Sequence, residues 1–222
     1  MWRDALLVAG KDLRIEWRSR VATNQVVPFA LVVLVLFGLA LGPGAAQLRP
    51  ATAGLFWVTV LLATVLGVQR SFSIESADNA RDGLRLSGLD AGGIFVGKAA
   101  ALAFQLLVLE VVLAVVAALL YATPLSGIAL LAATCVLATA GLAAVGVLYG
   151  VVAAGTKVRE TLLPLLFFPV VAPVLLGATK SWSAALTRHP GSGVGWLGLL
   201  AAFSVAYLAL GTVVFGPLLE DA

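Results

Sequence analysis

Six long apolar stretches, separated by short charged connections, are the feature that most limits how this chain can fold. A helix rises about 1.5 Å per residue, so roughly 20 apolar residues cross a hydrocarbon core of about 30 Å. The stretches are residues 24–42, 51–69, 99–120, 126–154, 161–179 and 194–219. Backbone groups in lipid find partners only within helices or closed barrels. The sequence therefore predicts an all-α integral membrane protein with six transmembrane helices, a single membrane domain over residues 1–222.

Composition supports this prediction. Hydrophobic residues make up 61% of the 222 residues and charged residues 11%, whereas a soluble domain carries about 25% charged residues. The connections are too short to hold a soluble catalytic domain. The basic residues behind the net charge of +3 flank the apolar stretches. We interpret them as membrane anchors rather than as a nucleic-acid surface, and we expect membrane lipid as a partner.

Residues 1–23 precede the first apolar stretch and differ from it in character. Their apolar residues recur at helical spacing, at Trp2, Ala5, Leu6, Ala9, Leu13 and Trp17. Charged residues occupy much of the remaining circumference. This pattern predicts an amphipathic helix in the membrane interface. The alternative is a frayed basic tail.

Lysine and arginine alternate between the two sides of the predicted membrane domain. Residues 1–23 hold five, residues 70–98 hold four and residues 155–160 hold two, whereas the other side holds Arg49, Lys180 and Arg188. Short cytoplasmic loops are the ones enriched in positive charge. We therefore expect both termini in the cytoplasm.

The connection at 70–98 is the longest polar segment and combines charges with leucines. We expect its glycines, including Gly92 and Gly93, to break it into short helices that dock onto a partner protein. The candidate docking residues are Glu75, Asp78, Leu84, Arg85 and Leu86. The alternative is a solvated loop.

A stretch from Gly92 to Lys98 resembles a phosphate-binding loop, which reads G-x-x-x-x-G-K-[ST]. Position 99 is Ala, so the hydroxyl that would bind magnesium is missing, and no strand is expected before it. We exclude ATP binding by this segment and interpret Lys98 as an interfacial anchor of the third span.

Two polar side chains fall inside the third apolar stretch. Glu110 is an intramembrane carboxylate, and Gln105 lies five residues earlier on a slightly different face. Intramembrane carboxylates are functional candidates by default. Glu110 has a role in proton-coupled transport or coupling, is a protonated or hydrogen-bonded structural residue, or lies near the outer surface. In the fifth stretch, Pro164, Pro169 and Pro173 predict helix kinks, and we expect this helix to be buried or to line a path.

His189 is the only histidine, and Trp182 and Trp196 lie seven residues to either side. We place Trp182 and His189 in the last external loop. Histidine ligates haem iron in many proteins, so these three residues are candidates for haem contact. The alternative is a polar surface loop. No metal-ligand cluster or nucleophile–base pair is visible in the sequence, so we expect neither an enzyme nor a chain that binds a cofactor alone.

The order of these features resembles the type-2 exporter permeases of ATP-binding-cassette transporters, and more narrowly the CcmB family, haem exporter protein B of cytochrome c maturation. The matching segments are Lys11–Arg18, Phe56-Trp57, Phe72-x-x-Glu75, Leu84–Leu89, Gly97-Lys98, Leu162–Pro169 and Pro173.

The resemblance implies a permease subunit in the bacterial inner membrane. It also implies a separate ATPase like CcmA, which would bind the ATP, further membrane subunits like CcmC and CcmD, and a haem chaperone like CcmE. Haem would then be the substrate, or the ligand of the chaperone that is released. The alternatives are an exporter permease for a lipid, polysaccharide or drug, and a proton-coupled transporter that uses Glu110.

Overall fold

The structure, a computed structural model, describes residues 1–20, 22–42, 45–77, 88–154, 159–187 and 190–221. Every regular element in these ranges is helical. The helices are α1 (Trp2–Ser19), the π-helical turn η1 (Ala22–Val26), α2 (Val27–Ala40), α3 (Ala45–Ala77), α5 (Ala91–Leu120), α6 (Ile128–Ala154), α7 (Arg159–Leu186) and α8 (Pro190–Asp221).

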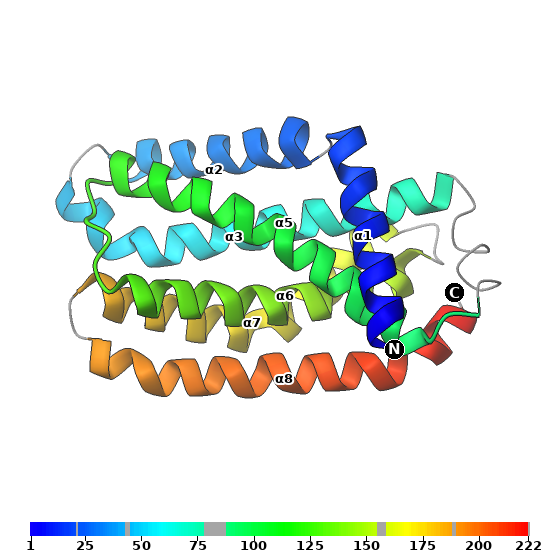
Figure 1. Ribbon diagram of the computed structural model, residues 1–222. Coiled ribbons are helices and arrows are strands. Elements are labelled where there is room, and N and C mark those ends of the chain that lie inside the picture. The colour runs from blue at the N-terminus through cyan, green and yellow to red at the C-terminus, as the bar shows by residue number, and fades with distance from the viewer. Residues whose placement is uncertain (21, 43–44, 78–87, 155–158, 188–189, 222) are drawn as a thin grey trace.

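Among the described helices, α2, α3, α5, α6, α7 and α8 run side by side along a bundle, and α1 lies across one end of it (Figure 1). The centre of the bundle is α6, which contacts α3, α5, α7 and α8. Helix α8 ends at the same end of the bundle at which α1 begins (Figure 1). This arrangement suits an even number of crossings.

Among the described residues, five helices are long and apolar enough to cross a bilayer. The segments are Gln47–Phe72, Ala91–Leu120, Ile128–Ala153, Leu163–Leu186 and Gly191–Leu219. The count rises to six when Trp2–Ser19 and Asn24–Ala40, which meet at a bend of 57°, are taken together. Asn24–Ala40 alone covers about 25 Å, and it runs along the bundle (Figure 1). The predicted all-α membrane fold is confirmed.

Small residues place α6 at the centre. Positions 141–148 of this helix are all buried. A Cβ atom on Gly146 would lie 2.8 Å from a methyl group of Val68, and one on Gly150 would overlap the ring of Phe72. These glycines therefore allow α6 to approach α3 closely, as small residues do where lipid provides no hydrophobic driving force between helices.

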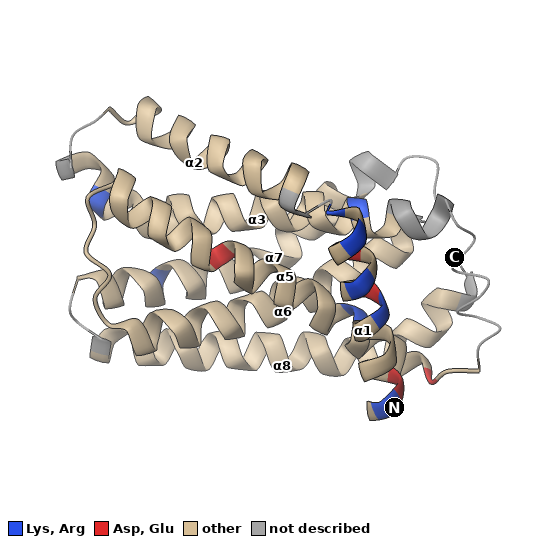
Figure 2. Cartoon of the chain, turned by 45° about the horizontal axis from the view of Figure 1, so that its top comes forward, with Lys and Arg blue, Asp and Glu red and all other residues tan. Residues whose placement is uncertain are grey.

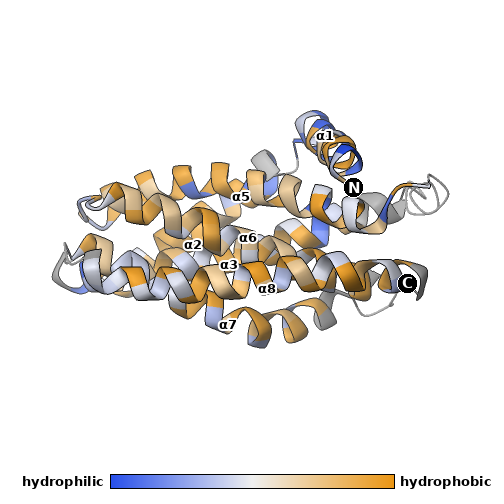
Figure 3. Cartoon of the chain, turned by 60° about the horizontal axis from the view of Figure 1, so that its bottom comes forward, coloured by the Kyte–Doolittle hydropathy of each residue, from blue (hydrophilic) through white to orange (hydrophobic). Residues whose placement is uncertain are grey.

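Hydrophobic residues cover most of the length of the bundle helices (Figure 3). Many large ones are exposed, including Leu39, Leu119 and Val213, each more than 70% accessible. Such a surface is unfavourable in water and suits contact with lipid.

Several helix boundaries differ from the sequence prediction. Helix α3 continues to Ala77 and α5 begins at Ala91, so the connection predicted over 70–98 is shorter. The side chain of Asp90 accepts a hydrogen bond from the Gly93 amide at 2.7 Å and caps α5. Gly92 and Gly93 are therefore part of the first turn of α5. Our expectation that these two glycines break the connection into short helices is wrong. Helix α7 likewise continues past residue 179 to Leu186.

The amphipathic helix is present as α1, but its apolar stripe divides between two surroundings. Ala5 and Val8 are buried against α5, whereas Trp2 and Trp17 are 75% and 84% exposed. Small residues thus dock the helix on the bundle, and the large aromatic residues remain outside. Exposed tryptophans next to arginines are typical of a helix at headgroup depth.

Candidate functional site

The crossing of α1 over the start of α5 depends on two glycines. A Cβ atom on Gly93 would lie 2.8 Å from the Met1 carbonyl oxygen, and one on Gly97 would lie 2.6 Å from the Ala5 carbonyl oxygen. Real Cβ atoms do not make contacts this short with backbone oxygen. Only residues without a side chain allow the two backbones to cross here.

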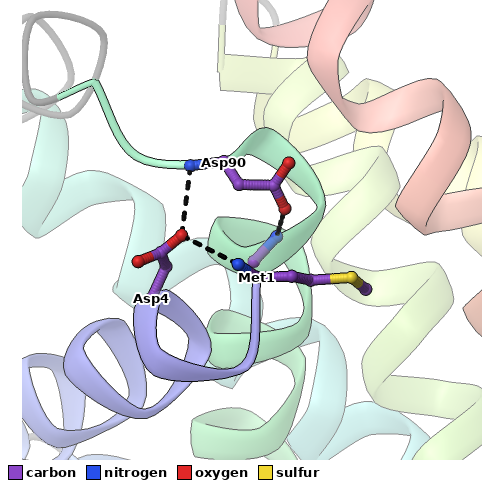
Figure 4. A network of polar contacts seen from close by, with 4 residues as sticks. Met1, Asp4 and Asp90 are labelled. Carbon is purple, nitrogen blue, oxygen red and sulfur yellow. Dashed lines mark hydrogen bonds and ion pairs between the residues drawn. The ribbon is translucent and has the colours of Figure 1, made fainter.

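A polar network joins the beginnings of the same two helices (Figure 4). The Asp4 carboxylate accepts hydrogen bonds from the Met1 ammonium group at 3.1 Å and from the Asp90 amide at 3.4 Å. The bond from the ammonium group is the main reason why the pKa of Asp4 lies below its ordinary value. Asp90 in turn caps α5 through Gly93.

Lys98 lies where α1, α3 and α5 meet. Its side chain is 5% exposed, and its ammonium nitrogen is 3.5 Å from Asp12 Oδ2 and 5.4 Å from the centroid of the Phe72 ring. A buried cation requires such partners. The carboxylate of Asp12 also lies 3.0 Å from Lys11 Nζ. Lys98 is therefore more than the membrane anchor that the sequence predicts, because it links three helices.

The segment that resembles a phosphate-binding loop thus has a packing explanation. Gly93 and Gly97 allow α1 to cross α5, and Lys98 pairs with Asp12. A Cβ atom on Gly92 would lie 3.3 Å from the Thr212 carbonyl oxygen of α8. The whole segment is helical and begins α5. Sequence reasoning missed this docking of α1. The available signal was the four-residue spacing of Gly93 and Gly97 together with the small residues of α1.

A cavity of about 710 Å³ lies beneath α1, between η1, α2, α3 and α5. Charged residues of α1, α3 and α5 line one part of it, and the rest is mostly apolar. The lining residues include Asp12, Glu16, Arg20, Arg70, Lys98, Gly67, Ala101, Leu102, Leu106 and Leu109. Gln105 lines the same cavity. Charged residues gather on α1, at this end of the bundle (Figure 2).

Glu110 lies on a different side of α5 from the cavity. Its side chain is 2% exposed, and its Oε1 accepts a hydrogen bond from Thr139 of α6. Its Oε2 has no hydrogen-bond partner among the described residues. The structure does not bring Gln105 and Glu110 together. Glu110 instead connects α5 to the central helix.

Two of the three residues predicted to contact haem, Trp182 and Trp196, lie in different helices. Trp182 lies inside α7, is 1% exposed and stacks on Phe56 with 3.9 Å between ring centroids. The Trp57 ring meets the Trp182 ring edge-on, with 5.9 Å between ring centroids. The placement of Trp182 in an external loop is therefore wrong, because α7 extends two turns beyond its most apolar part. Trp196 is half-buried on α8, and His189 lies outside the described residues.

Pro164, Pro169 and Pro173 lie within the continuous helix α7. Tyr207 of α8 donates a hydrogen bond of 2.7 Å to the Val170 carbonyl, between the second and third prolines. A neighbouring helix thus supplies a polar contact where proline weakens the backbone ladder. The outer face of α7 is exposed, with Leu165 66% accessible. Our expectation that this helix is buried holds only for its inner face.

One of the five candidate docking residues belongs to a described helix. Glu75 belongs to the last turns of α3, and its side chain is not described. Asp78, Leu84, Arg85 and Leu86 lie outside the described residues. The ends of α3 and α5 that flank them are at the α1 end of the bundle (Figure 1).

Comparison with known proteins gives one consistent result. A family model described as CcmB protein matches residues 3–220. A protein named heme exporter protein B from Paracoccus denitrificans is 31% identical over 210 residues, with 93% of each chain covered. Its namesakes from Pseudomonas aeruginosa and Haemophilus influenzae are 29% and 27% identical, with 90% and 92% of each chain covered.

Proposed function

This chain belongs to the CcmB protein family, and from that premise we propose that it is the membrane permease subunit of a bacterial haem exporter that serves cytochrome c maturation. The match over residues 3–220 is the observation that carries the proposal. The name of its relatives, heme exporter protein B, supplies the substrate. The multi-pass helical fold suits a permease.

Energy would come from a separate ATPase subunit like CcmA. In the proposed mechanism this subunit docks on the connection between α3 and α5, and subunits like CcmC and CcmD complete the complex. Closure of the ATPase on ATP displaces the ends of α3 and α5. Helix α1 would move with α5, because Gly93, Gly97 and the Lys98–Asp12 pair join them.

The opposite end of the bundle provides a support for this movement. There, Tyr121 donates a hydrogen bond of 2.7 Å to the Leu34 carbonyl, and Arg49 donates one of 2.8 Å to the Ala122 carbonyl. Ser126 donates one of 2.8 Å to the Ala185 carbonyl. These bonds connect the turn between α5 and α6 to α2, α3 and α7. Rigid helices held at one end transmit displacement as tilt between discrete packings, which would release haem or a haem-loaded chaperone like CcmE outside.

Complementation tests the function. We expect this chain to restore c-type cytochromes, detected by haem staining, in a bacterium that lacks its own heme exporter protein B. Vector alone is the negative control, and immunoblotting of membranes verifies insertion. A chain that inserts at normal abundance and restores no c-type cytochrome would count against a haem exporter and favour another substrate.

A second experiment tests the docking site. Leu84→Asp together with Leu86→Asp is expected to lower co-purification of the ATPase subunit at least tenfold, because two apolar side chains of the proposed contact would become charged. The control makes the same change at the other end, with Leu125→Asp and Ile128→Asp, which are exposed there. Unchanged recovery of the ATPase with the Leu84/Leu86 variant would exclude docking through these leucines.

A further inference from the structure

The cavity beneath α1 combines a charged mouth with apolar walls. Arg20 of the α1 C-cap, Arg70 of α3 and Lys98 of α5 line it together with Asp12 and Glu16. Three basic residues thus face two acidic ones, and Lys98 is already paired with Asp12. The mouth therefore carries an excess of positive charge and suits an anionic group.

Below the mouth the lining is mostly apolar, with Gln105 as a polar exception, and reaches toward the membrane. The deeper walls are formed by Ala63, Gly67, Leu102, Leu106 and Leu109. On the rim, Phe104 and Val108 of α5 are 56% and 52% exposed. Because α5 is a spanning helix, these side chains face the hydrocarbon region. A ligand can enter sideways from the lipid.

We propose that this cavity is a binding site for an anionic glycerophospholipid of the surrounding leaflet. The phosphate lies at Arg20 and Arg70, at the level where the exposed Trp17 of α1 suits the headgroup region. An acyl chain lies along the leucine wall of α5. The lipid fills the space between α1 and α2 and supports α1 on the bundle.

The side chains that line the cavity suit a phospholipid rather than haem. Haem iron is held in proteins by His, Cys, Met or Tyr side chains. The described residues that line the cavity include none of these four types. The cavity volume of about 710 Å³ lies in the usual range of small-molecule sites, roughly 300–1,000 Å³. The proposal does not depend on haem export or on the ATPase.

Filling the cavity provides the main test. A Cβ atom on Gly67 meets only Leu102, at an ordinary 3.7 Å, so Gly67→Leu places its side chain in the space without backbone overlap. Gly54 of the same helix has nothing within 4 Å of its Cβ position and does not line the cavity. Gly54→Leu is the matched control. Native mass spectrometry of the full-length variants, purified from vesicles of phosphatidylcholine and phosphatidylglycerol, measures the retained lipid.

We expect the unmodified chain and Gly54→Leu to retain phosphatidylglycerol, and Gly67→Leu to lose it at least tenfold. Arg70→Gln changes an exposed residue of the mouth, so it tests the site even if Gly67→Leu fails to fold. It is expected to lower the preference for phosphatidylglycerol over phosphatidylcholine about fivefold, the factor for one basic residue near anionic lipid. Equal retention by the two leucine variants, or no preference for the anionic lipid in the unmodified chain, would overturn the proposal. Haemin binding that Gly67→Leu abolishes would overturn it too.

Discussion

At the scale of single residues, Lys98 and Asp12 form an unequal pair. Lys98 is 5% exposed, whereas the Asp12 side chain is 13% exposed and also contacts Lys11. Losing the carboxylate removes the ion pair of a buried cation that keeps its contact with the Phe72 ring, whereas losing the cation leaves the more exposed Asp12 beside Lys11. We expect Asp12→Asn to lower the free energy of unfolding by about 1.5–3 kcal/mol. This is less than for a fully enclosed pair, since the flexible lysine stem can carry its charge toward water.

Lys98→Met is the companion variant and is expected to be the milder of the two, because its thioether side chain fills the same space. Thermal unfolding of both variants in detergent, monitored by circular dichroism, measures the difference. Equal losses, or a greater loss for Lys98→Met, would contradict the unequal pair.

Glu110 is the second residue for which the structure predicts a distinct outcome. Its hydrogen bond from Thr139 joins α5 to α6, and a glutamine amide oxygen can accept the same bond. We therefore expect Glu110→Gln to restore c-type cytochromes nearly as well as the unmodified chain, whereas Glu110→Leu, which leaves the Thr139 hydroxyl without this acceptor, is less stable by about 1–3 kcal/mol. Haem staining and thermal unfolding are the two measurements. Complete loss of activity in a stably folded Glu110→Gln variant would instead support proton transfer.

At the scale of elements, the α1–α5 crossing sets two effects of a glycine substitution against each other. Gly97→Ala raises helix propensity by about 1 kcal/mol, but its Cβ atom would lie 2.6 Å from the Ala5 carbonyl oxygen. Overpacking of this kind costs roughly 1–3 kcal/mol, so we expect net destabilisation and displacement of α1. Faster hydrogen exchange of the α1 amides in Gly97→Ala is the measurement.

The matched control lies on α1 itself. Gly10 has nothing within 4 Å of its Cβ position, so Gly10→Ala gains helix propensity without overlap. This variant is expected to exchange no faster than the unmodified chain. Similar exchange in Gly97→Ala and Gly10→Ala would mean that α1 is not held by the crossing.

At the scale of the whole molecule, the charge distribution predicts an orientation. The basic residues of α1 lie at one end of the bundle (Figure 2), and positive loops remain cytoplasmic. We expect Ser192→Cys, at the start of α8, to react with a membrane-impermeant maleimide in intact cells. Ser19→Cys, at the end of α1, is expected to react only after permeabilisation. Both side chains are exposed, and Cys135→Ala removes the single native thiol. Labelling of Ser19→Cys in intact cells would show the opposite orientation, with α1 outside the cell.

Much of this fold could be predicted from local patterns. Apolar stretches long enough for a bilayer locate the helices at 51–69, 126–154 and 194–219 close to their observed positions, because length and polarity act on each segment independently. Boundaries near glycine or charge were less accurate. Gly92 and Gly93 break a helix in water, but here Asp90 caps the turn and α1 covers it. The same holds for Trp182, whose burial against Phe56 follows from packing between distant helices.

The amino-acid sequence by itself determined that the chain enters a membrane and where most of its long apolar helices lie, since hydropathy and helix length need no knowledge of neighbours. Its order of motifs also indicated the family. Only the tertiary structure decided that Lys98 pairs with Asp12 and that α1 packs on Gly97. It also decided that a cavity with charged residues at its mouth lies beneath α1. The physical reason is separation along the chain. Residues 86 positions apart meet only when helices cross, and in lipid the geometry of crossing depends on the fit of small surfaces rather than on apolar burial.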